Sequence, residues 1–382
     1  MMFNFDEIIN RHNTDSTKWD FNNDPENVIP MPVADMDFRC PEPIIQSMLE
    51  VAEHGVMGYS FVPKELKSLF TQRMKDLYDW EIQEEWQVWI PGLVPGITTS
   101  YKAVGQSGDE VMTTIPVYGP FHLAPTWADR KLVTVPLLLE GERWVMDFEA
   151  IEKAMTPRTK VFMLCNPYNP GGTVFTPAEL TKLVEICQRH NVVICSDEIH
   201  CDLILDENLR HTPTASLSPE AAHMTITLMA PSKTFNIAGL GCSVAIIPNK
   251  ELRDKFIFAK AGVFPELNRF GIRAAYAAYK DCEPWRKELV KYLKTNHDIL
   301  HTAMNAITGL KMNKLEATYL AWVDARETGI DNLAEHLLKH GIRVVDGPVF
   351  KGQGFFRVNF GCTRATLEEG IKRIQEAFAS VN

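Results

Sequence analysis

The chain has 382 residues, with 39 Lys and Arg against 49 Asp and Glu, which gives a formal net charge of −10. This balance argues against nucleic acid as the main partner, because phosphate backbones are bound by clustered positive charge. Hydrophobic residues make up 45% and charged residues 23%, which is a globular composition and excludes a disordered chain. At about 100–200 residues per domain, the length predicts a large domain with a smaller companion.

The N-terminus and the cysteines predict a cytoplasmic protein. The acidic pair Asp6-Glu7 lies where a secretory signal would need basic residues followed by an apolar run. The long uncharged stretch 111–128 is broken by three prolines, so no membrane span is expected. The eight cysteines form no C-x-x-C pair, which fits reduced thiols.

Strands and helices alternate through the middle of the chain. Strand-like runs are expected at 110–115, 131–135, 160–165, 192–196 and 224–229. Such alternation predicts a parallel sheet covered on both faces. One helix start is explicit, because Thr176, Pro177 and Glu179 form a capping box, and this helix should run to about His190.

The last third of the chain has a different pattern. Residues 265–306 look mostly helical, and shorter elements follow, with strands at 319–324, 342–345 and 355–360 and a helix at 331–340. A second capping box, Thr366 with Glu369, predicts the start of a final helix. We therefore predict three parts: an N-terminal segment 1–45 that packs with the small domain, a large domain 46–285 and a small α+β domain 286–382.

Lys233 is the first candidate for chemistry. It follows the strand-like run 224–229, lies between Ser232 and Thr234, and precedes an uncharged run that ends at Asn249. Desolvation at such a place lowers the pKa of a lysine and makes the amine a nucleophile toward an aldehyde. The alternative, a loop lysine turned to water, would be preferred if this residue stood alone.

Asp197 is the second candidate. It follows a strand, at the edge where open α/β sheets bind ligands, and a carboxylate there can keep a pyridine nitrogen protonated. A metal is a rival, since Glu198, His200 and Asp202 are also ligand types. Strand alternation sends Asp197 and Glu198 to opposite faces, which weakens that rival. A helix cap at Asp197 is the remaining alternative.

A third polar segment contains two Asn-Pro steps, Asn166-Pro167 and Asn169-Pro170. Proline excludes the helical region for the residue before it, so each Asn is held in an extended turn with its amide in a fixed position. A plain connecting loop is the alternative for this segment.

Together these motifs resemble the fold-type I pyridoxal phosphate enzymes of the aminotransferase class I/II superfamily, and most of all the cystathionine β-lyase (MalY/PatB-type) group. Supporting segments lie along nearly the whole chain, at 18–20, 33–38, 58–60, 116–121, 318–320 and 356–359. The resemblance implies an α/β fold with a large pyridoxal phosphate-binding domain, whose mainly parallel seven-stranded sheet is flanked by helices, and a smaller α+β domain.

The resemblance also implies pyridoxal 5′-phosphate as the cofactor, attached covalently to Lys233. Asp197 would pair with the ring nitrogen and Asn166 with the ring 3-oxygen. His200 would lie near Asn166, and Tyr118 would stack on the ring.

Further residues are implied for the phosphate and the substrate. The amides of Gly96 and Ile97, at a helix start, and the Ser232 hydroxyl would hold the phosphate. Tyr59 would reach the phosphate and the substrate in the other subunit of a homodimer. Arg357 would bind the α-carboxylate of a small amino acid by a two-pronged bond.

The implied activity is that of a carbon-sulfur β-lyase, which cleaves cystathionine or a related cysteine S-conjugate by α,β-elimination to a thiol, pyruvate and ammonia. Tyr168 and Thr173 replace the His and Arg that this group commonly carries, which keeps a class I/II aminotransferase as an alternative. Many aminotransferases, however, have an arginine where this chain has Gly241. A non-catalytic regulator on the same fold is a remote alternative.

Overall fold

The computed structural model describes residues 3–20 and 24–379, and within them the main feature is a seven-stranded sheet. Strands β9, β8, β7, β3 and β4 are parallel to one another, and β10 runs antiparallel to its neighbours β9 and β2. The mainly parallel sheet predicted from the sequence is therefore confirmed. In spatial order the strands are β2 (Gln87–Ile90), β10 (Ser243–Ile246), β9 (Thr225–Met229), β8 (Val193–Asp197), β7 (Thr159–Cys165), β3 (Glu110–Ile115) and β4 (Lys131–Pro136).

The central strands of this sheet are covered on both faces, because nearly every residue of β7, β8 and β9 is buried. The predicted capping box is present: Thr176 accepts from the Glu179 amide, and Glu179 accepts from the Thr176 amide. The helices around the sheet are α3 (Leu93–Ala103), α4 (Pro120–Trp127), α5 (Phe148–Ala154), α6 (Pro177–Arg189), α7 (Pro219–Met224) and α8 (Lys250–Lys260). A hairpin of β5 (Leu138–Glu140) and β6 (Arg143–Val145) lies beyond β4.

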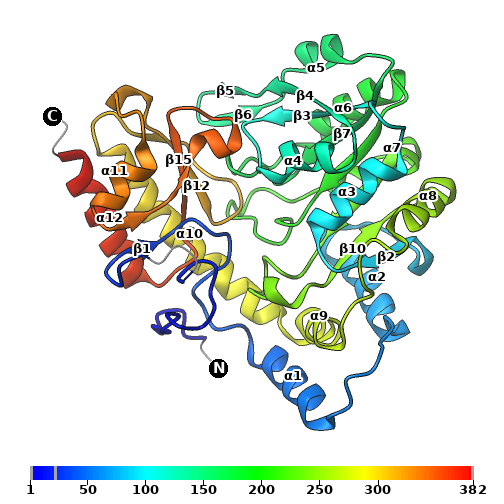
Figure 1. The fold of residues 1–382 in the computed structure, drawn as a ribbon, viewed down its shortest axis with the longest axis horizontal. Helices are drawn as coiled ribbons and strands as arrows, with labels where there is room; N and C mark the ends of the chain where they lie inside the picture. Colours follow the sequence, from blue (N-terminus) through cyan, green and yellow to red (C-terminus); the bar gives the residue numbers. More distant parts are fainter. Residues whose placement is uncertain (1–2, 21–23, 380–382) are drawn as a thin grey trace.

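A second, antiparallel sheet of four strands forms the other part of the molecule (Figure 1). Its order is β11 (Lys311–Met312), β12 (Leu320–Asp324), β15 (Phe355–Asn359) and β14 (Val345–Asp346). The run expected as one strand at 342–345 is divided, because β13 (Ile342–Arg343) instead pairs with β1 (Ile29–Pro30). That pairing ties the N-terminal segment to this part of the chain.

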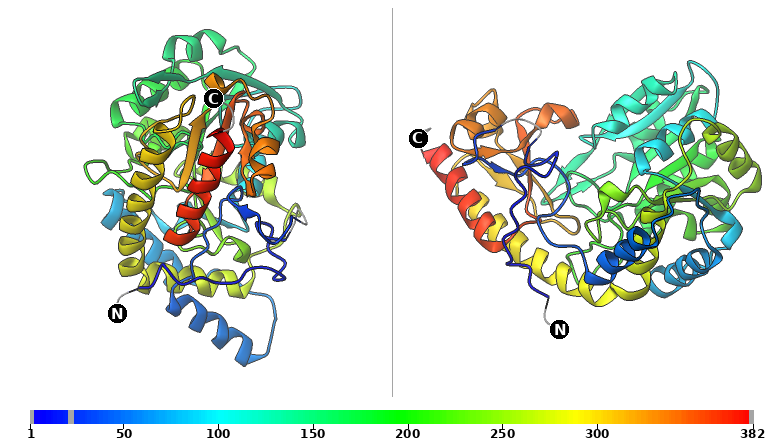
Figure 2. Two further views of the ribbon diagram at one scale, coloured as in Figure 1. Left: turned by 90° about the vertical axis from the view of Figure 1, so that its left-hand side faces the viewer. Right: turned by 60° about the horizontal axis from the view of Figure 1, so that its bottom comes forward.

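Long helices connect the two sheets (Figure 2). Helix α9 (Arg269–Asp281) packs on α1 (Glu42–His54) and α2 (Lys64–Tyr78), and α10 (Glu283–Asn305) continues to the second sheet. There α10 meets α12 (Arg364–Ala379), which also packs on α11 (Leu333–Lys339). No helix within the described ranges is long and apolar enough to cross a membrane.

The predicted start of the last helix is wrong. Helix α12 begins at Arg364, and Thr363 is its cap, because the Thr363 hydroxyl accepts the Thr366 amide at 3.2 Å. Glu369 binds Arg373 one turn later and does not reach back to the helix start. Thr363 and Thr366 are three residues apart, and the sequence pattern placed the helix cap at Thr366 instead of Thr363.

Candidate active site

Three side chains named from the sequence meet at one edge of the large sheet. Asn166 follows β7, Asp197 ends β8 and Lys233 follows β9, and these three strands are neighbours. The backbone N–H of Asn166 donates to the backbone carbonyl of Asp197 at 3.0 Å. Parallel pairing thus brings together residues from three separate segments at the edge where open α/β sheets bind ligands.

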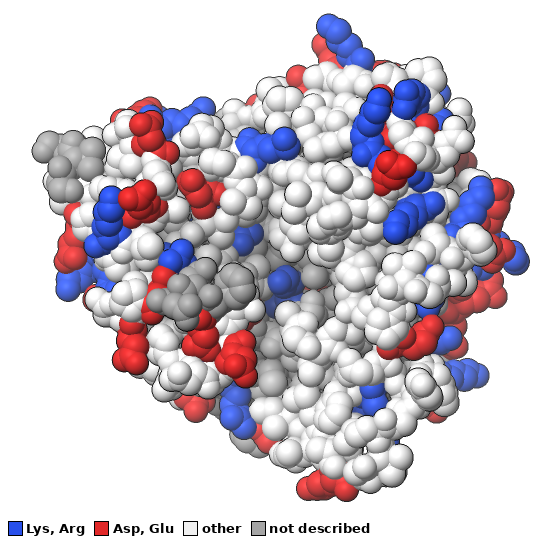
Figure 3. Space-filling model, in the orientation of Figure 1, with Lys and Arg blue, Asp and Glu red and all other residues white. Residues whose placement is uncertain are grey.

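A cavity of about 400 Å³ lies at this edge. Its lining includes Asp197, His200, Ser232 and Lys233 from the large sheet and Arg357 from β15. Figure 3 shows a hollow on this side of the molecule with Lys or Arg atoms at depth. The cavity is therefore formed by both sheets, together with residues 32–34 of the N-terminal segment.

Lys233 has the desolvated amine that the sequence predicted. Its Nζ donates to the Ala34 carbonyl at 2.6 Å. Burial, helped by the Arg357 charge, lowers the pKa of the Lys233 ammonium to about 8, while Asp35 and Asp197 act in the opposite direction. A substantial fraction of this lysine is neutral near pH 8.

Asp197 is a buried carboxylate with little internal compensation. Its Oδ1 accepts the Ile199 amide at 3.1 Å, and no Lys or Arg of the described chain forms an ion pair with it. Burial raises the pKa of Asp197 to about 7, although the Ile199 amide and the Lys233 charge pull it down. A cation placed against this carboxylate would be strongly favoured.

Asn166 and His200 each have a buried nitrogen without a hydrogen-bond partner among the described residues. Asn166 Oδ1 accepts the Phe175 amide at 3.1 Å, whereas its Nδ2 is unpartnered. His200 Nδ1 is also unpartnered, and burial lowers the pKa of His200 to about 3, helped by Lys233 and Arg357. His200 is therefore a neutral imidazole.

Arg357 is held from two sides. One terminal nitrogen donates to Asn169 Oδ1 at 3.2 Å and the other to the Pro32 carbonyl at 2.8 Å, while Nε has no partner in the described chain. Its guanidinium also lies over the Phe350 ring, 4.8 Å from the centroid. Burial lowers the pKa of Arg357 to about 10, so the side chain is still a cation at neutral pH.

Asn169 and Tyr319 are site residues to which sequence reasoning gave no role. Asn169 orients Arg357, and the Tyr319 hydroxyl donates to the same Ala34 carbonyl as Lys233, at 2.9 Å. The second Asn-Pro step could have drawn attention to Asn169. No local signal marks the Ala34 carbonyl.

Tyr118 lines the cavity at the start of α4 and is half-buried. Its ring meets the Phe121 ring edge-on, with the centroids 6.0 Å apart. Burial raises the pKa of Tyr118, and the Asp197 charge adds to the rise, so its hydroxyl is neutral.

The amides expected to hold a phosphate lie inside helix α3. Helix α3 begins at Leu93, so Gly96 and Ile97 lie in its second turn, and the Gly96 amide already donates to the Gly92 carbonyl at 3.3 Å. Neither residue lines the cavity, whereas Leu93, Val94 and Ser232 do. The amides of Leu93 and Val94 are in the first turn, where a helix has free N–H groups that attract anions.

Three further residues named from the sequence lie away from the cavity. Tyr59 is fully exposed in the loop between α1 and α2. Tyr168 is fully buried, its hydroxyl donates to the Pro116 carbonyl, and its amide donates to the Thr173 carbonyl at 2.8 Å. Neither Tyr168 nor Thr173 lines the cavity, so neither gives an aminotransferase a direct contact with substrate.

Comparison with known proteins agrees with this geometry. Residues 26–374 match the sequence profile described as aminotransferase class I and II. The chain belongs to the aminotransferase class I and II family. A curated family member, cystathionine beta-lyase PatB of Bacillus subtilis (strain 168), is 38% identical over 388 residues, which cover 98% of this chain and 100% of that protein.

Two solved structures of the family extend the likeness to the whole fold. OvoB superposes with a TM-score of 0.96 at 41% identity, covering 99% of this chain and 100% of that one. Cystalysin from Treponema denticola, which contains pyridoxal 5′-phosphate, gives a TM-score of 0.96 at 32% identity and covers 100% of both chains.

Gly241 marks where this family member differs from many aminotransferases. It lines the cavity eight residues after Lys233, with a φ of +57°. A Cβ there would lie 2.9 Å from the Pro91 carbonyl oxygen, so an arginine at this position would be strained.

Proposed function

We propose that this protein is a pyridoxal phosphate-dependent carbon-sulfur β-lyase that acts on cystathionine or a related cysteine thioether. Its products would be a thiol, pyruvate and ammonia. The observation that carries the proposal is that Asp197, Lys233 and Arg357 line one cavity. Asn166 does not line it but follows the neighbouring strand, and its backbone amide donates to the Asp197 carbonyl. The name of the relative PatB, a cystathionine beta-lyase, supports it.

The incompletely paired polar groups of the site fit this cofactor. The buried Asp197 carboxylate lacks a cation, which a protonated ring nitrogen would provide, and the unpartnered Asn166 Nδ2 is a donor for the ring oxygen. The first-turn amides of Leu93 and Val94 suit a phosphate dianion. When bound, pyridoxal phosphate supplies an electron sink for the electron pair left at the substrate Cα.

Arg357 would select and orient the substrate. It remains cationic at neutral pH and keeps Nε free, while Asn169 and the Pro32 carbonyl fix the plane of the guanidinium. A carboxylate bound to such a preorganised fork is held in one orientation. The α-carboxylate of an amino acid would thereby place its Cα near Lys233.

Lys233 would transfer the proton from the substrate Cα to the leaving group. Its amine has a pKa of about 8, so it can accept a proton from Cα near physiological pH and return it to the leaving group. The sulfur leaves Cβ with the electrons of the carbon-sulfur bond, and one proton restores the thiol. The neutral His200 adds no charge that would compete with the ammonium.

We further propose a cytoplasmic homodimer with three parts in each chain, 1–45, 46–285 and 286–382. Two separate sheets and the pairing of β1 with β13 support this division. The eight cysteines are free thiols, as a cytoplasm would keep them. The exposed side chains of Val56, Met57, Tyr59 and Phe61 supply an apolar loop that a second subunit would cover.

The test is an assay of the purified protein loaded with pyridoxal phosphate. With cystathionine, pyruvate and a free thiol should appear in equal amounts, and serine in place of cystathionine serves as a control without sulfur. An aminotransferase, the second candidate, would instead form a keto acid that retains the substrate side chain and would require an amino acceptor. A protein that binds the cofactor but releases no pyruvate and no thiol would contradict the lyase proposal.

A further inference from the structure

Residues 32–38 form a segment, here called the strap, that runs between the two sheets. Asn359 of β15 donates to the carbonyls of Val33 and Asp35. From the side of the large sheet, Asn236 donates to the carbonyls of Met36 and Phe38 and accepts the Met36 amide. The strap backbone is therefore fixed from both sides of the cavity.

The strap contacts the reactive lysine through one backbone carbonyl. Ala34 O accepts from Lys233 Nζ at 2.6 Å and from the Tyr319 hydroxyl at 2.9 Å. The carboxylate that follows in the chain is Asp35, and a second cavity of about 630 Å³ is lined by both Asp35 and Lys233. Asp35 thus adjoins the residue whose carbonyl holds the Lys233 amine, and it borders the same cavity as that lysine.

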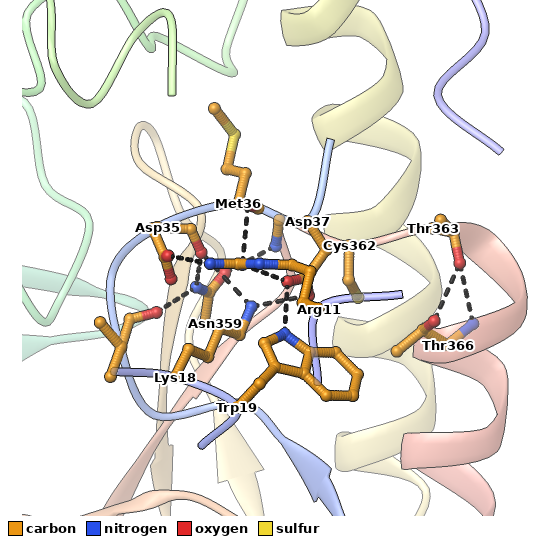
Figure 4. A network of polar contacts seen from close by, with 12 residues as sticks. Arg11, Lys18, Trp19, Asp35, Met36, Asp37, Asn359, Cys362, Thr363 and Thr366 are labelled. Carbon is orange, nitrogen blue, oxygen red and sulfur yellow. Dashed lines mark hydrogen bonds and ion pairs between the residues drawn. The ribbon is translucent and has the colours of Figure 1, made fainter. Parts of the chain in front are cut away.

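The two carboxylates of the strap differ in how well they are paired (Figure 4). Asp37 is bound by Arg11 at 2.7 Å, Lys18 at 2.7 Å and Trp19 Nε1 at 2.9 Å. Asp35 binds Arg11 through Oδ2 at 2.6 Å, whereas its buried Oδ1 has no hydrogen-bond partner among the described residues. Both carboxylate oxygens of Asp37 are therefore bound, whereas one oxygen of Asp35 has no partner among the described residues.

We propose that Asp35 is a positioning residue whose charge, moderated by Arg11, controls how readily Lys233 releases and accepts its proton while the amine rests on the Ala34 carbonyl. The inference rests on the proposed function, in which Lys233 moves the proton. The strap would then influence the proton transfer by Lys233 as well as closing one side of the cavity.

The charges around Lys233 give the direction of the effect. Arg357 of β15 disfavours the ammonium, whereas Asp35 of the strap and Asp197 of β8 favour it, with Asp35 ahead of Asp197. His200 is neutral, and burial raises the pKa of both Tyr118 and Tyr319, so these groups bring no charge. Losing the Asp35 charge should lower the pKa of Lys233, and losing its counterion Arg11 should raise it.

Two variants, each of which removes one charge, test these opposite signs. In the holoenzyme the cofactor absorbance band reports the proton on the Lys233 nitrogen joined to the cofactor. Asp35→Asn should move the pH midpoint of this band, and the acid limb of kcat/KM, down by about 0.5–1 pH unit, because the same nearby charge acts on that nitrogen. Arg11→Gln should move both up. The pH dependence of the rate at which the cofactor-free chain captures pyridoxal phosphate is an independent readout, since only the neutral amine reacts.

Asp37→Asn is the matched control. It breaks contacts with Arg11, Lys18 and Trp19, so it should lower the melting temperature with little movement of the absorbance midpoint. Asp35→Glu, which keeps the charge, should keep the midpoint near that of the wild type. If Asp35→Asn and Arg11→Gln shift the midpoint in the same direction, or if Asp37→Asn shifts it as far as Asp35→Asn, the proposal is overturned.

These outcomes separate the inference from the proposed function. Opposite midpoint shifts in a protein that releases no pyruvate from any thioether would refute the lyase activity and leave the role of Asp35 standing. An active lyase whose midpoint is unchanged in both variants would refute the role of Asp35 alone. Should Asp35→Asn fail to fold, Arg11→Gln and Asp35→Glu still decide the sign.

Discussion

The segment 197–202 contains two kinds of buried polar residue side by side. Glu198 accepts from Ser196 Oγ at 2.8 Å and from the Thr214 amide at 3.0 Å, and it contacts His211 Nε2 at 2.7 Å. Among the described residues, the carboxylate of its neighbour Asp197 accepts one hydrogen bond, from the Ile199 amide. Glu198, which follows the end of β8, is bound within the fold, whereas Asp197, the last residue of β8, faces the cavity.

The same contrast holds three residues further on. Asp202 is bound by Arg73 at 2.8 Å, by the Tyr78 hydroxyl and by Thr234 at 3.3 Å, whereas His200 has an unpartnered nitrogen. A buried polar group without a partner costs about 1–3 kcal/mol. In this segment the Glu198 and Asp202 carboxylates are satisfied by partners within the fold, whereas Asp197 and His200 keep polar atoms that a ligand could complete.

Among the buried polar residues that face the cavity, replacing Lys233 should have the largest effect on activity. Lys233→Ala should reduce pyruvate release by at least about 10³-fold, because a positioned general base alone contributes about 10²–10⁴-fold and the attachment point is lost as well. The cofactor absorbance band should disappear while circular dichroism is unchanged. A protein that regulates by contact would keep its biological effect in this variant.

Asp202→Ala tests the buried polar residues that are bound within the fold. Arg73 would keep only Glu283, at 3.3 Å, as a partner. Removing one member of a buried ion pair costs about 3–5 kcal/mol, which urea denaturation would measure. Turnover per folded molecule should change little, and a loss of turnover at unchanged stability would show that the two sets of residues are not separate.

Asp197→Asn should lower turnover but stabilise the cofactor-free chain. The folded pKa of Asp197 is raised to about 7, so the ionised carboxylate is penalised above pH 7 and not below about pH 4, where both states are protonated. Removing it should add roughly 2–4 kcal/mol to the free energy of unfolding at pH 8. Denaturation curves at pH 4 and pH 8 check this, and an equal gain at both values would contradict it.

Tyr168→Phe should have the smallest effect. It removes the hydrogen bond to the Pro116 carbonyl, which is worth about 1 kcal/mol. Since Tyr168 does not line the cavity, the ratio of pyruvate release to keto-acid formation should stay the same. The ratio is measured by separating the keto acids. A changed ratio would show that Tyr168 affects the choice of reaction and would favour an aminotransferase.

The sequence predicted well where the signal was local or followed strand periodicity. The five runs expected in the large sheet are strands β3, β4, β7, β8 and β9, with ends displaced by one residue at most. It missed β2 and β10, because each is only four residues long and is buried at every residue, so no alternation of polar and apolar residues marks it. No capping side chain marks Gly92 as the start of α3, so the sequence placed the expected phosphate amides, those of Gly96 and Ile97, further along the helix.

By itself, the sequence determined the family and the order of the strands along the chain. It also singled out Lys233, Asp197, Asn166 and Arg357 as candidate site residues, because each stands in a local motif. Only the tertiary structure decided which polar groups remain unsatisfied, since that depends on partners far away in the chain. Arg357 meets Asn169 across 188 positions, and Lys233 meets the Ala34 carbonyl across 199. The place of Asp35 beside the lysine results from the same long-range packing, which no spacing in the sequence records.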